Sequence, residues 1–226
     1  MKKISFALLF IFLGMIVMAQ QNEKTEIRNL KPFDKIKSSK GINVTLREGD
    51  EPKAEVVISN AELEDVIIQQ TGREVAIKMK TKIYKDLIVD VYVTYQSLRE
   101  ISAGTGGTIT SDDIIEADQL TLEAGMDASI ELEIEVKKLK ASVSAARIEV
   151  SGTADYVEAN ISSGRFLGAK LECEEAYIKA NATGSAQIWV TEKLEATAGS
   201  GAKIEYKGNP EKVEMKTNLG GKVEEM

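Results

Sequence analysis

Apolar and polar residues alternate through most of this chain, and this pattern predicts β-strands. The segment Ile130-Glu-Leu-Glu-Ile-Glu-Val136 alternates without interruption. In an extended strand its apolar side chains share one face and its glutamates share the other. We therefore expect one face to be buried and the other to be hydrated. Only residues 61–70 have helical character, and we expect a turn followed by a short strand there.

Residues 27–97 contain shorter apolar segments, separated by turn-forming residues. Gly49-Asp-Glu-Pro52 and Thr71-Gly72-Arg73 are two of these separators. Short strands at regular spacing, with such turns between them, are typical of an all-β region. The expected strands lie at 33–36, 42–46, 54–58, 66–68, 75–79 and 87–93.

From residue 98 to 226, one sequence unit recurs. The units begin at Leu98, Leu120, Leu139, Val157, Ile178, Leu194 and Val213, which are 16 to 22 residues apart. Most units have three alternating apolar positions, then a small turn containing Gly, Ser, Thr or Ala. A unit of this length is too short for a helical pair, but it suits one coil of a β-helix. The sequence therefore predicts an all-β fold, a right-handed, single-stranded parallel β-helix with coils of about 19 residues. The β-rich region 27–97 is expected to form its first coils and cap.

Glycine recurs in the turns of these units and is expected to form a ladder along one corner of the coil. Gly164, Gly184 and Gly201 are examples. Glycine suits such a corner because it tolerates positive φ and close approach of backbones. No such turn is followed by the Lys-Ser/Thr of a phosphate-binding P-loop.

The first residues are predicted to be a signal peptide. Lys2 and Lys3 precede an apolar run, and Val17-Met-Ala19 resembles a cleavage site. We expect residues 1–19 to be removed, 20–26 to form a disordered leader and 27–226 to form one domain. No second apolar stretch approaches the length of a membrane span, so the mature chain is expected to have no transmembrane segment.

The composition of the chain makes some classes of partner unfavourable and excludes an internal disulfide. The chain carries a formal net charge of −7, and loss of the two lysines leaves −9. Nucleic acid and anionic membranes are therefore poor partners, because they require a concentrated basic surface. The single Cys173 cannot form an internal disulfide, and alternation places it inward beside Leu171.

The sequence lacks the residues of several common catalytic sites, although its many glutamates leave a catalytic carboxylate pair possible in principle. Histidine is absent, which excludes Ser-His-Asp hydrolysis and zinc sites built from Cys and His. Glutamates spaced by two along a strand are typical of a hydrated face. We therefore assign no catalytic, cofactor-binding or metal-binding residue. Trp189 is the one candidate ligand contact, because alternation places its ring on the outer face opposite Ile188.

One set of segments carries a family resemblance. Residues 28–36, the segment Gly41-Ile42-Asn43 with the strand after it, 75–78 and 91–104 resemble the head GIN domain family of Bacteroidetes. Members of that family are labelled auto-transporter adhesins. The likeness covers residues 27–226 and implies an exported β-helical protein at the cell envelope. The three motif residues are interpreted as structural, with Gly41 at a turn, Ile42 inward and Asn43 bonding backbone at the start of the strand.

These observations predict an exported, non-enzymatic module of the periplasm or outer cell surface. Its expected partner is a protein or glycan of the cell envelope, bound by a flat β face. One alternative is a β-helical enzyme that binds or cleaves polysaccharides, an analogy that rests on fold alone. Another is a scaffold that forms homo-oligomers through the open end of the β-helix, between Val213 and Val223.

Overall fold

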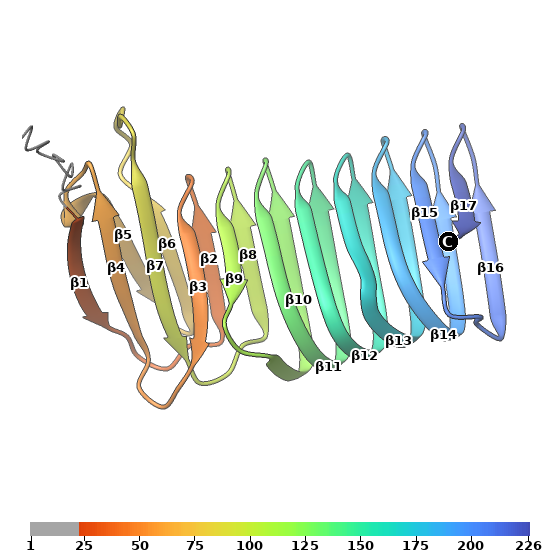
Figure 1. Ribbon diagram of the computed structural model, residues 1–226, viewed down its shortest axis with the longest axis horizontal. Helices are drawn as coiled ribbons and strands as arrows, with labels where there is room; N and C mark the ends of the chain where they lie inside the picture. The colour runs from red at the N-terminus through yellow and green to blue at the C-terminus, as the bar shows by residue number, and fades with distance from the viewer. Residues whose placement is uncertain (1–22) are drawn as a thin grey trace, which may run out of the picture.

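The computed structural model describes residues 23–226 as a β-solenoid (Figure 1). The predicted signal peptide and residues 20–22 lie outside the described residues. One short 3₁₀ helix, η1 (Leu63–Asp65), accompanies the strands. Among residues 23–226 no helix is long and apolar enough to cross a membrane. The strands are β1 (Glu23–Asn29), β2 (Lys35–Ser39), β3 (Asn43–Glu48), β4 (Lys53–Ser59), β5 (Val66–Thr71), β6 (Glu74–Met79), β7 (Ile88–Tyr95), β8 (Glu100–Gly104), β9 (Thr108–Ser111), β10 (Ile115–Gly125), β11 (Ser129–Ser144), β12 (Arg147–Ser162), β13 (Arg165–Asn181), β14 (Ser185–Ala198), β15 (Lys203–Lys207), β16 (Lys212–Thr217) and β17 (Lys222–Glu225).

Each long strand bends once and so contributes to both sides of a flattened coil. In β11 the bend falls at Lys137, which has no partner in the ladder between residues 136 and 138. Tight turns line the upper edge of the solenoid and the bends line its lower edge (Figure 1). We call the two sides face 1 and face 2. Face 1 consists of β5, β6, β2, β8, the C-terminal halves of β10 to β14, and β16; face 2 consists of β1, β4, β7, β3, β9, the N-terminal halves of β11 to β14, β15 and β17.

The predicted fold class is confirmed: the chain is an all-β solenoid of about 19-residue coils. Neighbouring coils pair in parallel from β8 to β17. One expected unit boundary was wrong by two residues, because Ala176 rather than Ile178 pairs with Val157 and Leu194. A shift of two leaves every side chain on the same face, so alternation alone could not detect it.

The core is a continuous apolar column between the two faces. In β11 the inward Ile130, Leu132 and Ile134 are buried while the glutamates between them are exposed, as predicted. Side-chain volume is balanced between coils, since the large Phe166 lies next to the small Ala186 in the ladder. Both are fully buried, which fits the close packing expected of an interior.

The N-terminal region does form the first coils and a cap, but in a different spatial order from the sequence. Strand β2 pairs in parallel with both β6 and β8, and β3 pairs with both β7 and β9. The coil made by β2 and β3 is therefore inserted between two coils that follow it in the chain. Antiparallel strands then close this end: β4 and β1 extend face 2, and β5 extends face 1.

Order begins earlier than expected. Strand β1 starts at Glu23 and pairs antiparallel with β4 from Glu23 opposite Ser59 to Asn29 opposite Lys53. The expected disorder of residues 23–26 is therefore wrong. The polar sequence of these residues gave no sign of a strand. β1 is an edge strand with mostly exposed side chains on both faces, so it has no buried apolar row. The turn and short strand expected at 61–70 are present as η1 and β5.

Some glycines of the corner are required by close approach between neighbouring turns. A Cβ at Gly164 would lie 2.6 Å from Val143 Cγ1, and one at Gly184 would lie 2.8 Å from Ile161 Cγ2. Neither glycine has positive φ, whereas Ser163 and Thr183 beside them do. Gly201 differs, because its φ is +74° and an added Cβ would have no atom closer than 3.7 Å. The corner therefore uses glycine for space at some turns and for backbone conformation at others.

Candidate binding faces

The head GIN motif lies in the turn of the inserted coil. Gly41 has φ of +70°, and its N–H donates to the carbonyl oxygen of Thr105 in the neighbouring turn at 3.1 Å. Ile42 is fully buried. The Asn43 side chain donates to the Asp90 carboxylate at 3.0 Å, rather than to the backbone groups we expected. These contacts tie the inserted coil to the coils on both sides of it.

A buried carboxylate holds the start of the same coil. Asp34 Oδ2 accepts from Arg73 Nε at 2.7 Å and lies 2.8 Å from Arg99 Nε. These arginines belong to the segments before β6 and β8, the two strands that enclose β2. Burial raises the pKa of Asp34, but the hydrogen bonds from Arg73 and Arg99 outweigh it and hold the pKa below the usual carboxyl value. The carboxylate is thus an ionic clamp across three coils.

Trp189 points outward from face 2, as alternation predicted, and packs against the next coil. The Lys207 ammonium lies 4.4 Å from the centre of its ring, within the range of a cation–π contact. A Cβ at Gly208 would lie 2.6 Å from Trp189 Cδ1. Lys207 and the backbone of Gly208 therefore cover part of the ring, and its role as a ligand contact stays a prediction.

Cys173 is buried in β13, as expected. Its Sγ donates to the carbonyl oxygen of Trp189 at 3.3 Å. Burial raises the pKa of the Cys173 thiol to about 12, so little of the nucleophilic thiolate exists at neutral pH.

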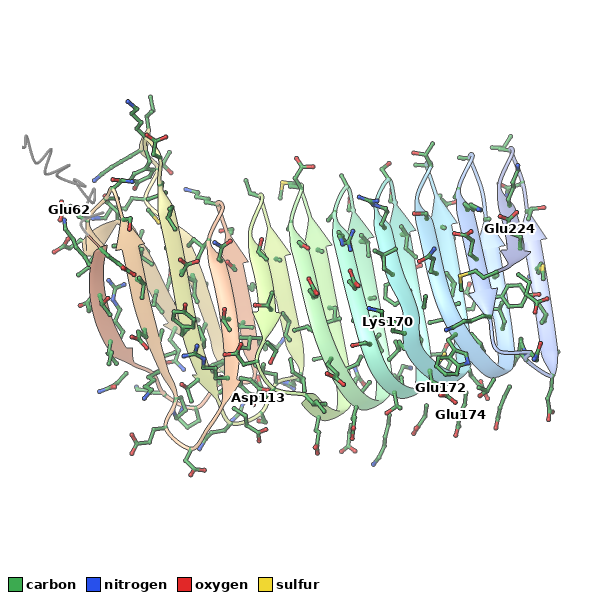
Figure 2. The ribbon with its side chains drawn as sticks, viewed as in Figure 1. Glu62, Asp113, Lys170, Glu172, Glu174 and Glu224 are labelled. Carbon is green, nitrogen blue, oxygen red and sulfur yellow. The ribbon has the colours of Figure 1, made fainter. Side chains whose placement is uncertain are left out.

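The outward residues of each face form ladders across the coils, and the residue type changes along a row, as in Glu131, Glu149, Leu167 and Gln187. Glu131, Glu133 and Glu135 lie exposed on face 2, and Glu172 and Glu174 lie near the lower edge, below Lys170 (Figure 2). Among residues 23–226 no group of three or more Asp, Glu, Cys or His side chains is arranged to hold a metal ion. The exposure of Glu131, Glu133 and Glu135 agrees with the hydrated face that their spacing predicted.

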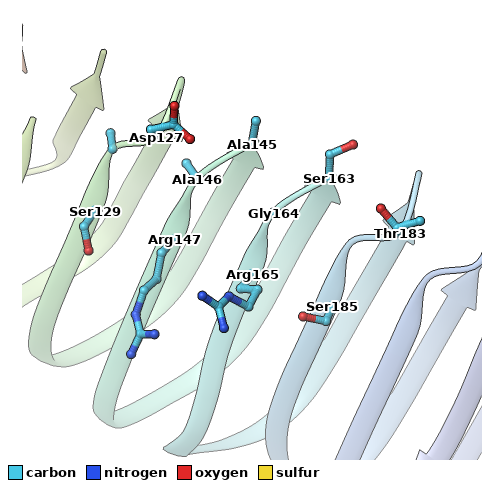
Figure 3. A pocket seen from close by; sticks show the side chains of 11 residues that line it. Asp127, Ser129, Ala145, Ala146, Arg147, Ser163, Gly164, Arg165, Thr183 and Ser185 are labelled. Atoms are coloured by element: carbon cyan, nitrogen blue, oxygen red, sulfur yellow. The ribbon is translucent and has the colours of Figure 1, made fainter. Parts of the chain in front are cut away.

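A shallow groove of about 490 Å³ crosses the start of β11 to β14 on face 2. Arg147 and Arg165 lie side by side in it on neighbouring strands, with Ser129 and Ser185 on the strands beyond (Figure 3). Arg147 also bonds to Glu149. Sequence reasoning missed this pair, although the signal was present: both arginines directly follow the small turn that precedes their strands.

The fold and these surfaces define a β-solenoid with flat faces, one capped end and one open end. The chain belongs to the family described as "putative auto-transporter adhesin, head GIN domain", whose model matches residues 32–210. A comparison with curated proteins gives no match.

Solved structures share this fold at low sequence identity. A protein described as a putative adhesin from Bacteroides fragilis is similar with a TM-score of 0.82 at 16% identity, over 91% of this chain and 98% of that one. A putative adhesin from Parabacteroides distasonis has a TM-score of 0.74 at 18% identity, over 92% and 98%. A putative lipid binding protein from the same species has a TM-score of 0.72 at 17% identity, again over 92% and 98%. At these identities the likeness shows the fold alone.

Proposed function

We propose that this protein is a non-enzymatic binding module of the cell envelope, exported to the periplasm or outer surface, which binds a protein or glycan by a flat face. The observation that carries this proposal is the form of its surface, where parallel ladders present polar and charged side chains on two elongated faces and a shallow groove crosses four strands. The family description as an adhesin supports it. An elongated face suits an extended partner, because successive coils can contact successive parts of that partner.

Purified protein tested against polysaccharides and envelope extracts would decide between this proposal and the enzymatic alternative. We expect saturable binding without release of shorter or unsaturated products. Turnover that disappears with one glutamate substitution, such as Glu133→Gln, would instead establish a polysaccharide-cleaving enzyme. Protease treatment of intact cells, and of cells whose outer membrane has been permeabilised, would locate the protein. A protein that resists digestion in both samples lies in the cytoplasm, which would contradict export.

A second function, self-association, is favoured by the open end of the solenoid. All six residues of β16 are exposed, including the inward-side residues Val213 at 36% and Met215 at 45%. Unpaired strand edges can pair with another chain. An antiparallel pair of two β16 strands centred on Met215 would place Glu214 of each copy opposite Lys216 of the other, and opposite charges in such pairs are stabilising.

Sedimentation velocity over a range of concentrations tests this second function. We expect dimers at high concentration. Met215→Lys should abolish them, because it places a charge at the centre of the interface between the two β16 strands. Ser142→Lys, on an exposed outward position of β11, serves as the matched control and should dimerise normally. A strict monomer at every concentration would exclude self-association.

A further inference from the structure

Arg165, in the groove on face 2, lacks an ion pair that basic residues at the start of several other strand segments form. In several strands a basic residue forms an ion pair with the glutamate two positions later. These pairs are Arg147 with Glu149, Lys193 with Glu195, Lys203 with Glu205 and Lys212 with Glu214. In β13 the corresponding residues are Arg165 and Leu167. Arg165 forms no ion pair with any residue of the described chain, 23–226.

The exposed Arg165 lies directly beside a second arginine. Arg147 and Arg165 are partners in the parallel ladder of β12 and β13, where neighbouring strands are about 4.8 Å apart. Like charges in this arrangement destabilise a sheet. Glu149 pairs with Arg147, so the guanidinium of Arg165 is left without an ion-pair partner beside a like charge. A ligand carrying an anion would relieve this repulsion.

The surroundings of the arginines suit a sugar. Ser129 and Ser185 occupy the same row on the flanking strands, one on each side of the arginine pair. Ser163 and Thr183 line the groove at the turns above. Hydroxyl groups donate and accept hydrogen bonds, as sugar hydroxyls require. The half-buried Leu167 adds an apolar surface two residues beyond Arg165.

We propose that Arg147 and Arg165 bind the carboxylate or sulfate group of an acidic saccharide, with the flanking serines contacting its hydroxyls. Guanidinium groups present paired N–H donors that match the oxygens of such anions. This inference rests on the proposed function, since it names the ligand class of face 2.

The acidic residues around the groove restrict the ligand further. Asp127 lines the groove, and Glu131 and Glu149 lie next to each other on the adjoining row of face 2. A dense polyanion would be repelled by these carboxylates. The expected ligand therefore carries isolated anionic groups on an otherwise neutral chain.

Isothermal titration with matched oligosaccharides tests this assignment. The probes are a xylo-oligosaccharide with one glucuronate side group, the same chain with one sulfate ester, and the unsubstituted chain. We expect wild-type protein to bind one or both charged probes at least about tenfold more tightly than the neutral one. The two charged probes distinguish a carboxylate from a sulfate ligand.

Two variants should weaken this binding at least about tenfold by different means. Arg165→Gln removes the guanidinium, and Leu167→Glu restores the missing carboxylate partner. Matched controls on face 1 are Lys179→Gln and Thr197→Glu, which change the charge equally and should bind within about twofold of wild type. Because Arg165→Gln relieves a repulsion, the free variant should be at least as stable as wild type in urea, so that lost binding is not lost folding.

The outcomes separate this inference from the proposed function. Equal affinity for charged and neutral probes, no binding of either charged probe, or full binding by Arg165→Gln and Leu167→Glu would overturn the arginine site. An envelope partner that crosslinks equally to wild type and Arg165→Gln would leave the proposed function in place with the arginine site excluded. Failure of every envelope partner and glycan to bind would contradict both.

Discussion

The two ends of this solenoid are built differently, although both consist of the same alternating strands. From β10 onward, strands stack in the order of the sequence and each coil contacts its immediate neighbours. In residues 23–111 the order is permuted, antiparallel strands close the end, and the ionic contacts of Asp34 join segments far apart in the chain. The repeat region is thus stabilised by apolar stacking between coils that follow one another in the sequence, whereas the cap depends on strand pairings and ion pairs between segments far apart in the chain.

The largest effect should come from the apolar column. Phe166→Ala removes a fully buried ring and should cost about 3–5 kcal/mol. Urea unfolding measures the loss, and hydrogen exchange should show faster exchange in β12 to β14 with β2 to β9 still protected. Phe33→Ala, a similar deletion in the N-terminal region, should instead raise exchange in β2, β6 and β8 together. Uniform exchange changes in both variants would contradict the distinction between the two regions.

Breaking the ionic clamp should have the next largest effect. Asp34→Ala leaves Arg73 and Arg99 without their common acceptor and should cost about 2 kcal/mol, because hydrogen bonds to charged groups are lost. Differential scanning calorimetry or urea unfolding measures this loss. Glu195→Ala, which breaks an exposed pair in the repeats, should change stability by less than about 1 kcal/mol. Equal losses of stability in the two variants would show that the Asp34 contacts stabilise the fold no more than an exposed ion pair does.

Acid should also weaken the ionic clamp. The folded pKa of Asp34 is lowered, so its stabilising effect is present above the unfolded value of about 3.9 and is lost as pH falls through the folded value. The stability difference between wild type and Asp34→Asn should therefore be largest near pH 7 and shrink below about pH 4. A difference that stays constant from pH 7 to pH 3 would refute this linkage.

The smallest effect is expected at the turn of the GIN motif. Gly41 has positive φ, and a Cβ at this position would have nothing within 4 Å, so Gly41→Ala should cost only about 1 kcal/mol of backbone strain. Gly72→Ala, in the β5–β6 turn, shares both properties and should cost the same. Thermal unfolding compares the two. A loss of envelope binding in Gly41→Ala but not in Gly72→Ala would show that the motif contacts a ligand.

The surfaces were harder to predict than the elements. Alternation correctly placed Trp189 outward and Cys173 inward, because side-chain direction follows from strand periodicity. It could not show that Lys207 covers the Trp189 ring or that Arg147 and Arg165 lie side by side. Those contacts depend on the register between coils, which is set by pairing across about 18 residues of chain.

Most strands, their inward and outward faces and the coil length could be predicted from the amino-acid pattern, since each follows from spacing along the chain. The position of the β2–β3 coil between later coils, and the addition of β1 to the cap, became visible in the folded arrangement. Short alternating strands are locally alike and can pair with many neighbours, so their local pattern does not specify their partners. Their partners are chosen by long-range contacts, such as those of Asp34 with Arg73 and Arg99, that no local pattern records.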